Sequence, residues 1–166
     1  MFNKRRKEAT QAMLELGANA DEARLVARHA RVVRATEGQQ ICSIGNWERT
    51  LFVILQGGVT CVRADEESFE VGAGGVVGEL SVFGVNLFQV ANVTCGNGVV
   101  LLEIRGSKYH GIEDDCPLLK GLVTAALLKS SQSVDEARDR HRKRQFEQYE
   151  QIAAMQNWSR HVAPEA

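Results

Sequence analysis

A glycine-rich turn and the short segment after it, residues 72–83, are the part of the sequence best suited to hold a small anion. The glycines allow the backbone to come close to a ligand, and Gly78, Glu79, Leu80 and Ser81 are predicted to begin one helical turn with free amides. The Glu79 carboxylate would repel a phosphate, so it is better suited to accept a hydrogen bond from a ligand hydroxyl. The same residues also suit a plain sharp turn in which Glu79 stabilises a helix start by up to ~1 kcal/mol.

The segment around this turn carries no basic residue. Between Arg63 and Arg105 there is no Lys or Arg, whereas six Asp or Glu side chains occur there. The whole chain is nearly neutral, with 20 Lys and Arg against 21 Asp and Glu and a formal net charge of -1. Because no overall basic field exists to draw the chain onto nucleic acid or anionic lipid, any such binding must be local.

Three motifs in the middle of the chain resemble, in order, those of the cyclic nucleotide-binding domain family of kinase regulatory subunits, gated channels and catabolite-type activators. Residues 37–45 resemble the family's opening hairpin, residues 51–59 its central hairpin, and residues 78–81 its phosphate-binding cassette. The resemblance implies cyclic AMP or cyclic GMP as the ligand, with Glu79 at the ribose 2′-hydroxyl. The implied ligand-binding residues are Gly78, Glu79, Leu80, Ser81, Gln89, Val90 and Ala91.

The sequence departs from this family at Gln89, ten residues after Glu79, where the bacterial branch has an arginine that pairs with the cyclic phosphate. Such a charge-assisted contact is worth ~1.5–3 kcal/mol, so its loss predicts cyclic nucleotide binding that is roughly ten- to a hundredfold weaker. Phe88, Gln89 and Val90 resemble the Phe-Gln-Val-Thr motif of Popeye-domain proteins, which also lack the arginine and are regarded as binding cyclic AMP, although their Asp-Ser-Pro-Glu motif is absent here. Two interpretations stay open: a weak or altered nucleotide sensor, and a vestigial pocket in a dimerisation or protein-interaction module.

Short strands with glycine-rich connections are predicted around these motifs. β-Branched and apolar residues gather in seven segments, namely 31–35, 40–43, 51–56, 59–63, 69–71, 89–94 and 99–104. Seven short strands in about 75 residues predict a sandwich or barrel. The expected fold class is therefore mainly β with flanking helices: a double-stranded β-roll (jelly roll) of the cyclic nucleotide-binding type with an N-terminal helical pair and a long C-terminal helix.

Helices are predicted on both sides of this β-roll. Residues 4–16 form the first, and Asn19 opens the second through a capping box in which its side chain accepts the Glu22 amide while the Glu22 carboxylate reaches back. The expected organisation is a single domain, with N-terminal helices in 1–30, the β-roll and cassette in 31–104, and the hinge and C-terminal helices in 105–166.

The segment after the β-roll predicts a regulatory hinge. Residues 107–111 predict one helical turn, Pro117 opens a long helix, and a second capping box at Ser133 predicts that this helix breaks and restarts. We expect ligand binding at the cassette to favour one position of the hinge and C-terminal helices, by population shift. The output would pass to a protein partner that this chain does not contain.

The predicted C-terminal helix carries a narrow apolar stripe of Phe146, Tyr149, Ile152 and Ala153. Such a stripe suits a seam between two copies, which would make the chain a homodimer. The resemblance gives the same region a second role, in which the ring of Phe146 or Tyr149 caps the nucleotide base. A stripe that packs on its own β-roll fits equally well. The basic run at residues 138–144 is interpreted as a solvated helix face.

Other functional classes lack the residues that they need. The four cysteines form no Cys-x-x-Cys pair and are interpreted as free, buried thiols, and the four histidines lie outside residues 40–104, which argues against a cupin metal site. No nucleophile motif is present, so we expect no enzyme, no metal and no other cofactor. Two helices use most of the 62 residues after Ile104, which leaves no room for a DNA-binding helix-turn-helix. Without an apolar run near the ~20 residues of a membrane span, we expect a cytoplasmic protein.

Overall fold

The computed structural model describes residues 2–83 and 89–161. Residues 1–128 form one compact unit and residues 129–166 form a second. The helices are α1 (Phe2–Glu15), α2 (Ala20–His29), α3 (Glu79–Val82), α4 (Gly106–His110), the 3-10 helix η1 (Glu113–Asp115) and α5 (Pro117–His161). The strands are β1 (Ala30–Arg34), β2 (Gln40–Cys42), β3 (Thr50–Gln56), β4 (Gly58–Arg63), β5 (Ser68–Gly72), β6 (Val76–Val77), β7 (Ala91–Cys95) and β8 (Val100–Arg105).

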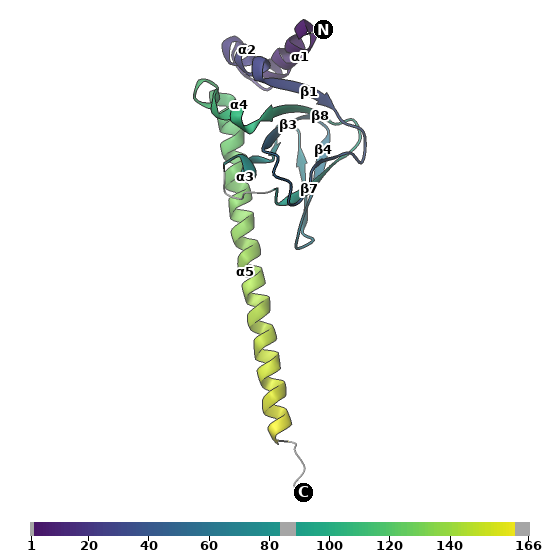
Figure 1. Ribbon diagram of the computed structural model, residues 1–166, viewed down its shortest axis with the longest axis vertical. Coiled ribbons are helices and arrows are strands. Elements are labelled where there is room, and N and C mark those ends of the chain that lie inside the picture. Colours follow the sequence, from purple (N-terminus) through teal and green to yellow (C-terminus); the bar gives the residue numbers. More distant parts are fainter. Residues whose placement is uncertain (1, 84–88, 162–166) are drawn as a thin grey trace. The chain divides into compact units, whose positions relative to one another are not determined.

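The strands form two four-stranded antiparallel sheets, in the orders β1-β8-β3-β6 and β2-β7-β4-β5 (Figure 1). This arrangement confirms the predicted β-roll. Strand β6 was not predicted, because it has only two residues within a glycine-rich turn and is defined by its pairing with Phe52 and Val53 of β3. The strand expected from Gln89 begins only at Ala91. The backbone of Gln89 instead bonds the loop before β3, since its carbonyl accepts the Gly45 amide and its amide donates to the Asn46 carbonyl, each at 3.0 Å.

Strand β3 explains why the β-roll needs its helices. Residues Thr50 to Ile54 of β3 are all buried, so the strand is covered on both faces. On one face, Leu51 and Val53 join a core cluster that includes side chains of the helices. On the other face, Phe52 and Ile54 join the core inside the roll. A continuous apolar run rather than an alternating one is the expected sequence of a strand buried on both faces.

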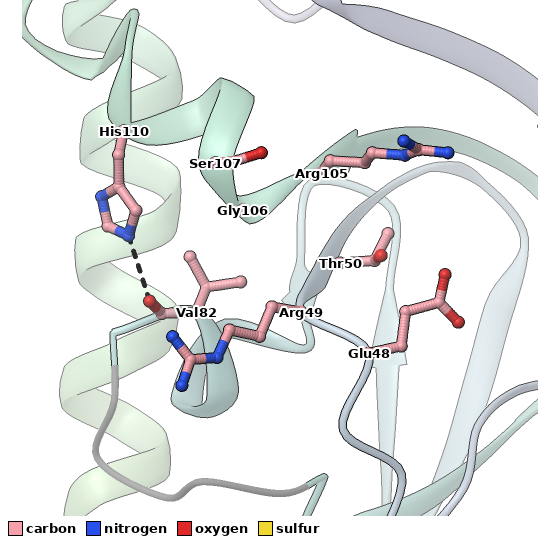
Figure 2. Close-up of a pocket in the computed structure, with 8 residues that line it drawn as sticks. All are labelled: Glu48, Arg49, Thr50, Val82, Arg105, Gly106, Ser107 and His110. Atoms are coloured by element: carbon pink, nitrogen blue, oxygen red, sulfur yellow. Dashed lines mark hydrogen bonds between the residues drawn. The ribbon is translucent and has the colours of Figure 1, made fainter.

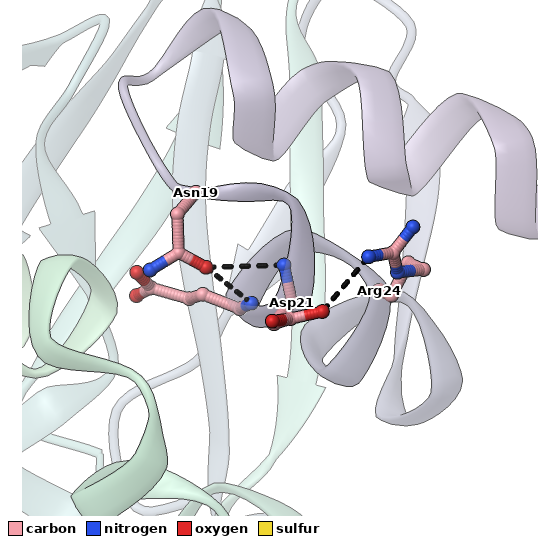
Figure 3. Close-up of polar contacts among 4 residues, drawn as sticks. Asn19, Asp21 and Arg24 are labelled. Atoms are coloured by element: carbon pink, nitrogen blue, oxygen red, sulfur yellow. Dashed lines mark hydrogen bonds and ion pairs between the residues drawn. The ribbon is translucent and has the colours of Figure 1, made fainter.

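The N-terminal helices confirm half of the predicted capping box. The Asn19 side chain accepts hydrogen bonds from the amides of Asp21 and Glu22, at 3.0 and 2.9 Å (Figure 3). The Glu22 carboxylate does not return to Asn19 as expected; it is 3% exposed and accepts a hydrogen bond from the Leu119 amide of α5 at 3.1 Å. Because that amide lies in the first turn of α5, where no intrahelical partner exists, Glu22 caps α5 from another helix.

The segment after β8 confirms the predicted short helix and the start of the long helix at Pro117. The predicted break at Ser133 is wrong, since α5 continues through it to His161. The sequence around Ser133 holds no glycine or proline, and an N-cap pattern alone does not interrupt a helix whose neighbouring residues favour the helical state. Among the described helices, none combines the length and the apolar character that a bilayer crossing needs.

Candidate functional site

Gly78 sets the shape of the cassette turn. It adopts a left-handed conformation with φ of 88°, and a Cβ atom at this position would lie 2.2 Å from the Thr50 carbonyl oxygen. For both reasons, only glycine fits at position 78 unless the backbone shifts. The turn is therefore pressed against the start of β3, and α3 begins at the next residue.

Glu79 and its neighbours in α3 are buried, with Glu79 5% exposed, Leu80 5% and Ser81 1%. The pKa of the Cys42 and Cys61 thiols is raised to about 12, mainly by burial and in part by the nearby Glu79 carboxylate. These two cysteines belong to the core inside the roll. The Glu79 carboxylate therefore acts on the interior of the roll, and the thiols are buried and free, as predicted. Their raised pKa keeps them protonated at neutral pH.

Gln89 and Ser81 contact each other directly. The Gln89 side chain is 8% exposed, and its Nε2 donates hydrogen bonds to the Ser81 Oγ at 3.0 Å and to the Glu48 carbonyl oxygen at 2.9 Å. The Ser81 hydroxyl in turn donates to the Gly78 carbonyl oxygen at 2.9 Å. Both amide hydrogens of Gln89 thus bond the protein itself. The side chain ties the cassette helix to the loop before β3.

The remaining predicted site residues lie in different parts of the chain. Val90 and Ala91 follow Gln89 and are half-buried at the start of β7. Phe88, which carries part of the Popeye-like motif, lies outside the described residues. Phe146 and Tyr149 lie on α5 in the second unit and are 64% and 72% exposed, and their assignment as a base cap stays a prediction.

The basic residue that precedes the acidic segment is already engaged elsewhere. The Arg63 guanidinium, 9% exposed, lies 3.3 Å from the Glu67 carboxylate and 5.1 Å from the centre of the Phe69 ring. These contacts hold Arg63 at the β4–β5 hairpin. Among the described residues, no group of three or more His, Cys, Asp or Glu side chains is arranged to hold a metal ion.

The end of the cassette helix contacts the helix α4, a connection that no sequence motif indicated. His110 bonds the Val82 carbonyl through its Nε2 at 3.0 Å, and a Cβ at Gly106 would lie 3.1 Å from the Val82 side chain (Figure 2). The Phe83 ring packs edge-on against Tyr109 and His110, with centroids 5.8 and 5.5 Å apart. The neighbouring aromatic residues Tyr109 and His110 could have indicated this contact. Their partners at residues 82–83 are neighbours only in the folded chain, so the sequence does not reveal them.

A cavity of about 540 Å³ lies beside this contact, and it adjoins the Ser81–Gln89 network at Glu48. Its lining includes Arg49 and Thr50 at the start of β3, Val82 at the end of α3, and Arg105, Ser107 and His110 around α4 (Figure 2). No sequence pattern groups these residues, because they come from three separate segments of the chain.

Comparisons with known proteins identify the type of fold that this chain adopts. No family model and no curated protein matches the chain. Solved structures do match: the regulatory subunit of a cAMP-independent protein kinase A from Trypanosoma brucei aligns with 26% identity and a TM-score of 0.62, covering 79% of this chain and 47% of that one. A cyclic nucleotide-binding domain from Methylobacillus flagellatus aligns with 19% identity and a TM-score of 0.61, covering 82% and 84%. The catabolite activator protein of Thermus thermophilus aligns with 19% identity and a TM-score of 0.58, covering 74% and 60%.

This chain spans about half the length of the trypanosomal kinase subunit. The matched structures share a β-roll with N-terminal and C-terminal helices, and domains of this kind are typically non-catalytic regulatory modules. The chain therefore has the fold of the cyclic nucleotide-binding domains.

Proposed function

We propose that residues 1–166 form a regulatory, non-enzymatic module that senses a small nucleoside-type ligand at the cassette, residues 78–83, and that binds cyclic nucleotides only weakly. The ligand would meet Gly78, Glu79, Leu80 and Ser81, with Gln89, Val90 and Ala91 completing the site. Glu79 suits the ribose hydroxyl contact because its carboxylate is an acceptor on the inner side of the roll.

The observation that carries this proposal is the engaged amide of Gln89. At the position where an arginine would meet the cyclic phosphate, the Nε2 group donates to Ser81 and to Glu48. No basic residue between Arg63 and Arg105 replaces the missing cation. A phosphate in this cassette would lose its hydration without gaining a charged partner, which costs free energy. An uncharged nucleoside avoids this penalty.

Two related structures support a neutral ligand. The regulatory subunit of a cAMP-independent protein kinase A from Trypanosoma cruzi is bound to guanosine, and it aligns with 22% identity and a TM-score of 0.60 over 80% of this chain. A variant of the Trypanosoma brucei subunit with three substitutions, one of which introduces an arginine, is bound to cAMP. We infer that loss of the cation shifts the preference of this cassette in the same way.

Ligand binding at the cassette would be transmitted to the C-terminal helix through α4. Val82 and Phe83 end the cassette helix and contact Gly106, Tyr109 and His110. A ligand that moves α3 therefore changes the support of α4 and of the α5 helix that follows it. Because Glu22 bonds the first turn of α5, the start of α5 and α2 would shift together.

Titration calorimetry tests the ligand class. We expect adenosine or guanosine to bind with a Kd equal to or lower than that of cyclic AMP and cyclic GMP. A cyclic nucleotide that binds at least tenfold more tightly than its nucleoside would contradict the proposal, since that difference, ~1.4 kcal/mol, would require a phosphate contact. Absence of binding by all four compounds would favour the second candidate function.

That second candidate is a module that pairs with another copy or with a protein partner and binds no ligand. It is favoured by the exposed apolar side chains on α5 in the second unit, which include Phe146, Tyr149, Ile152 and Met155. Deletion of residues 145–166 tests it by the mass in solution. A dimer that becomes a monomer supports pairing of two copies through this helix, whereas a monomer before and after the deletion excludes it.

A further inference from the structure

The cavity of about 540 Å³ beside the α3–α4 contact concentrates the positive charge that the cassette lacks. Arg49 and Arg105 both line it and are both exposed. Neither guanidinium has an ion-pair partner among the described side chains, whereas Arg31 pairs with Glu103 at 2.7 Å. Among the described lining residues, Glu48 is the only carboxylate.

The backbone fixes the two arginines to one place in the fold. Thr50 pairs with Arg105 across β3 and β8, and the Arg49 carbonyl accepts the Gly106 amide at 2.8 Å. The two side chains therefore start from neighbouring backbone positions. Figure 2 shows the two side chains extending in opposite directions from there, with the Arg49 guanidinium on the side of Val82.

The rest of the lining suits an organic molecule rather than a bare ion. Val82 gives an apolar surface, Ser107 gives a hydroxyl, and the His110 ring is held in place by its bond to the Val82 carbonyl. A volume of this size is typical of sites for small organic molecules. Guanidinium groups recognise phosphate and carboxylate through paired hydrogen bonds.

We propose that this cavity is a second ligand site, which binds a small organic molecule carrying phosphate or carboxylate groups. Its occupant would contact Val82 of α3 together with Ser107 and His110 of α4. It would therefore stabilise the α3–α4 contact through Val82, at the end of the cassette helix, and act as a second input to the hinge. The site does not depend on whether the cassette itself binds a nucleoside.

Thermal unfolding of the full chain tests this site with pyrophosphate and with citrate, each compared with sodium chloride at the same ionic strength. The double variant Arg49→Gln/Arg105→Gln should bind the stabilising anion at least tenfold more weakly. Arg5→Gln/Arg28→Gln is the matched control, because it removes the same charge from exposed positions outside the cavity. Glu48→Gln should bind the anion more tightly, since it removes the one opposing charge.

The two anions distinguish phosphate from carboxylate as the chemistry that this cavity binds. Stabilisation by pyrophosphate alone identifies phosphate groups as the ligand chemistry, and stabilisation by citrate alone identifies carboxylates. Stabilisation no greater than that of sodium chloride, or an equal loss in the control variant, overturns the proposal. Adenosine binding by the Arg49→Gln/Arg105→Gln variant separates the two sites: it should be unchanged, and failure of the cassette to bind adenosine leaves the anion result intact.

Discussion

Replacement of Gln89 by arginine tests directly whether a phosphate would sit beside this side chain. Gln89 is 8% exposed and its Nε2 makes two hydrogen bonds of 2.9 and 3.0 Å to Glu48 and Ser81. An arginine that turns toward a cyclic phosphate gives up these bonds, which at roughly 0.5–1.5 kcal/mol each would lower the free energy of unfolding by about 1–3 kcal/mol. Its charge-assisted contact with the phosphate stabilises the complex by about 1.5–3 kcal/mol. Cyclic AMP should therefore bind ten- to a hundredfold more tightly to Gln89→Arg than to the unaltered protein.

Calorimetric titration with cyclic AMP and with adenosine isolates the phosphate. The affinity for adenosine should change little, because adenosine has no phosphate to meet the new cation. Gln89→Met is the matched control: it keeps an unbranched side chain but removes both donors, so it should lose stability without gaining affinity for cyclic AMP. Equal tightening of adenosine and cyclic AMP, or an unchanged cyclic AMP affinity in a folded Gln89→Arg variant, would refute the placement of the phosphate beside residue 89.

Three further predictions concern the fold around the site. Gly78→Ala should lower the free energy of unfolding in a urea titration by about 3 kcal/mol or more, because it combines left-handed strain with a 2.2 Å approach of the new Cβ to the Thr50 carbonyl oxygen. Gly74→Ala has the left-handed strain alone, so it should lower the free energy of unfolding by about 1–2 kcal/mol. Glu22→Ala should lower the free energy of unfolding by about 1–3 kcal/mol by leaving the Leu119 amide unsatisfied, and Glu22→Gln should lose less because its carbonyl can still accept; equal losses would contradict the capping role. The pKa of the Cys42 and Cys61 thiols is raised from 9.0 to about 12, so the unfolded chain loses these protons at lower pH than the folded one. The free energy of unfolding should therefore fall as the pH rises from about 9 toward 12. The double variant Cys42→Ala/Cys61→Ala should reduce this pH dependence.

The sequence predicted those parts of the fold that depend on local patterns. Apolar periodicity located seven of the strands and the helices that flank them. The glycine-rich turn predicted a candidate cassette because its residues are neighbours in the chain. The family resemblance placed Gln89 at the cassette, and the 3.0 Å contact with Ser81 agrees with that position.

Except for the break at Ser133, the wrong predictions share a physical cause: a tertiary partner replaced the local one. Glu22 fits a capping box, but a buried carboxylate gains more from the unsatisfied Leu119 amide, 97 residues away, than from its own helix start. Gln89 was expected to begin a strand, yet its backbone bonds Gly45 and Asn46. The cavity beside α4 is lined by residues from three separate segments, so no single motif could indicate it.

The distribution of charge gives the two candidate sites different physical signatures. In the cassette, the segment from Arg63 to Arg105 has no basic residue and Gln89 supplies a neutral amide, so the free energy of binding a nucleoside there contains little charge interaction. In the outer cavity, Arg49 and Arg105 are exposed, and their attraction to an anion is screened by salt over about 10 Å at 0.1 M. Nucleoside binding should therefore change little with ionic strength, whereas anion binding should weaken as salt is added. Because Val82 and its neighbours connect both candidate sites to α4, the hinge would combine a charged and an uncharged signal.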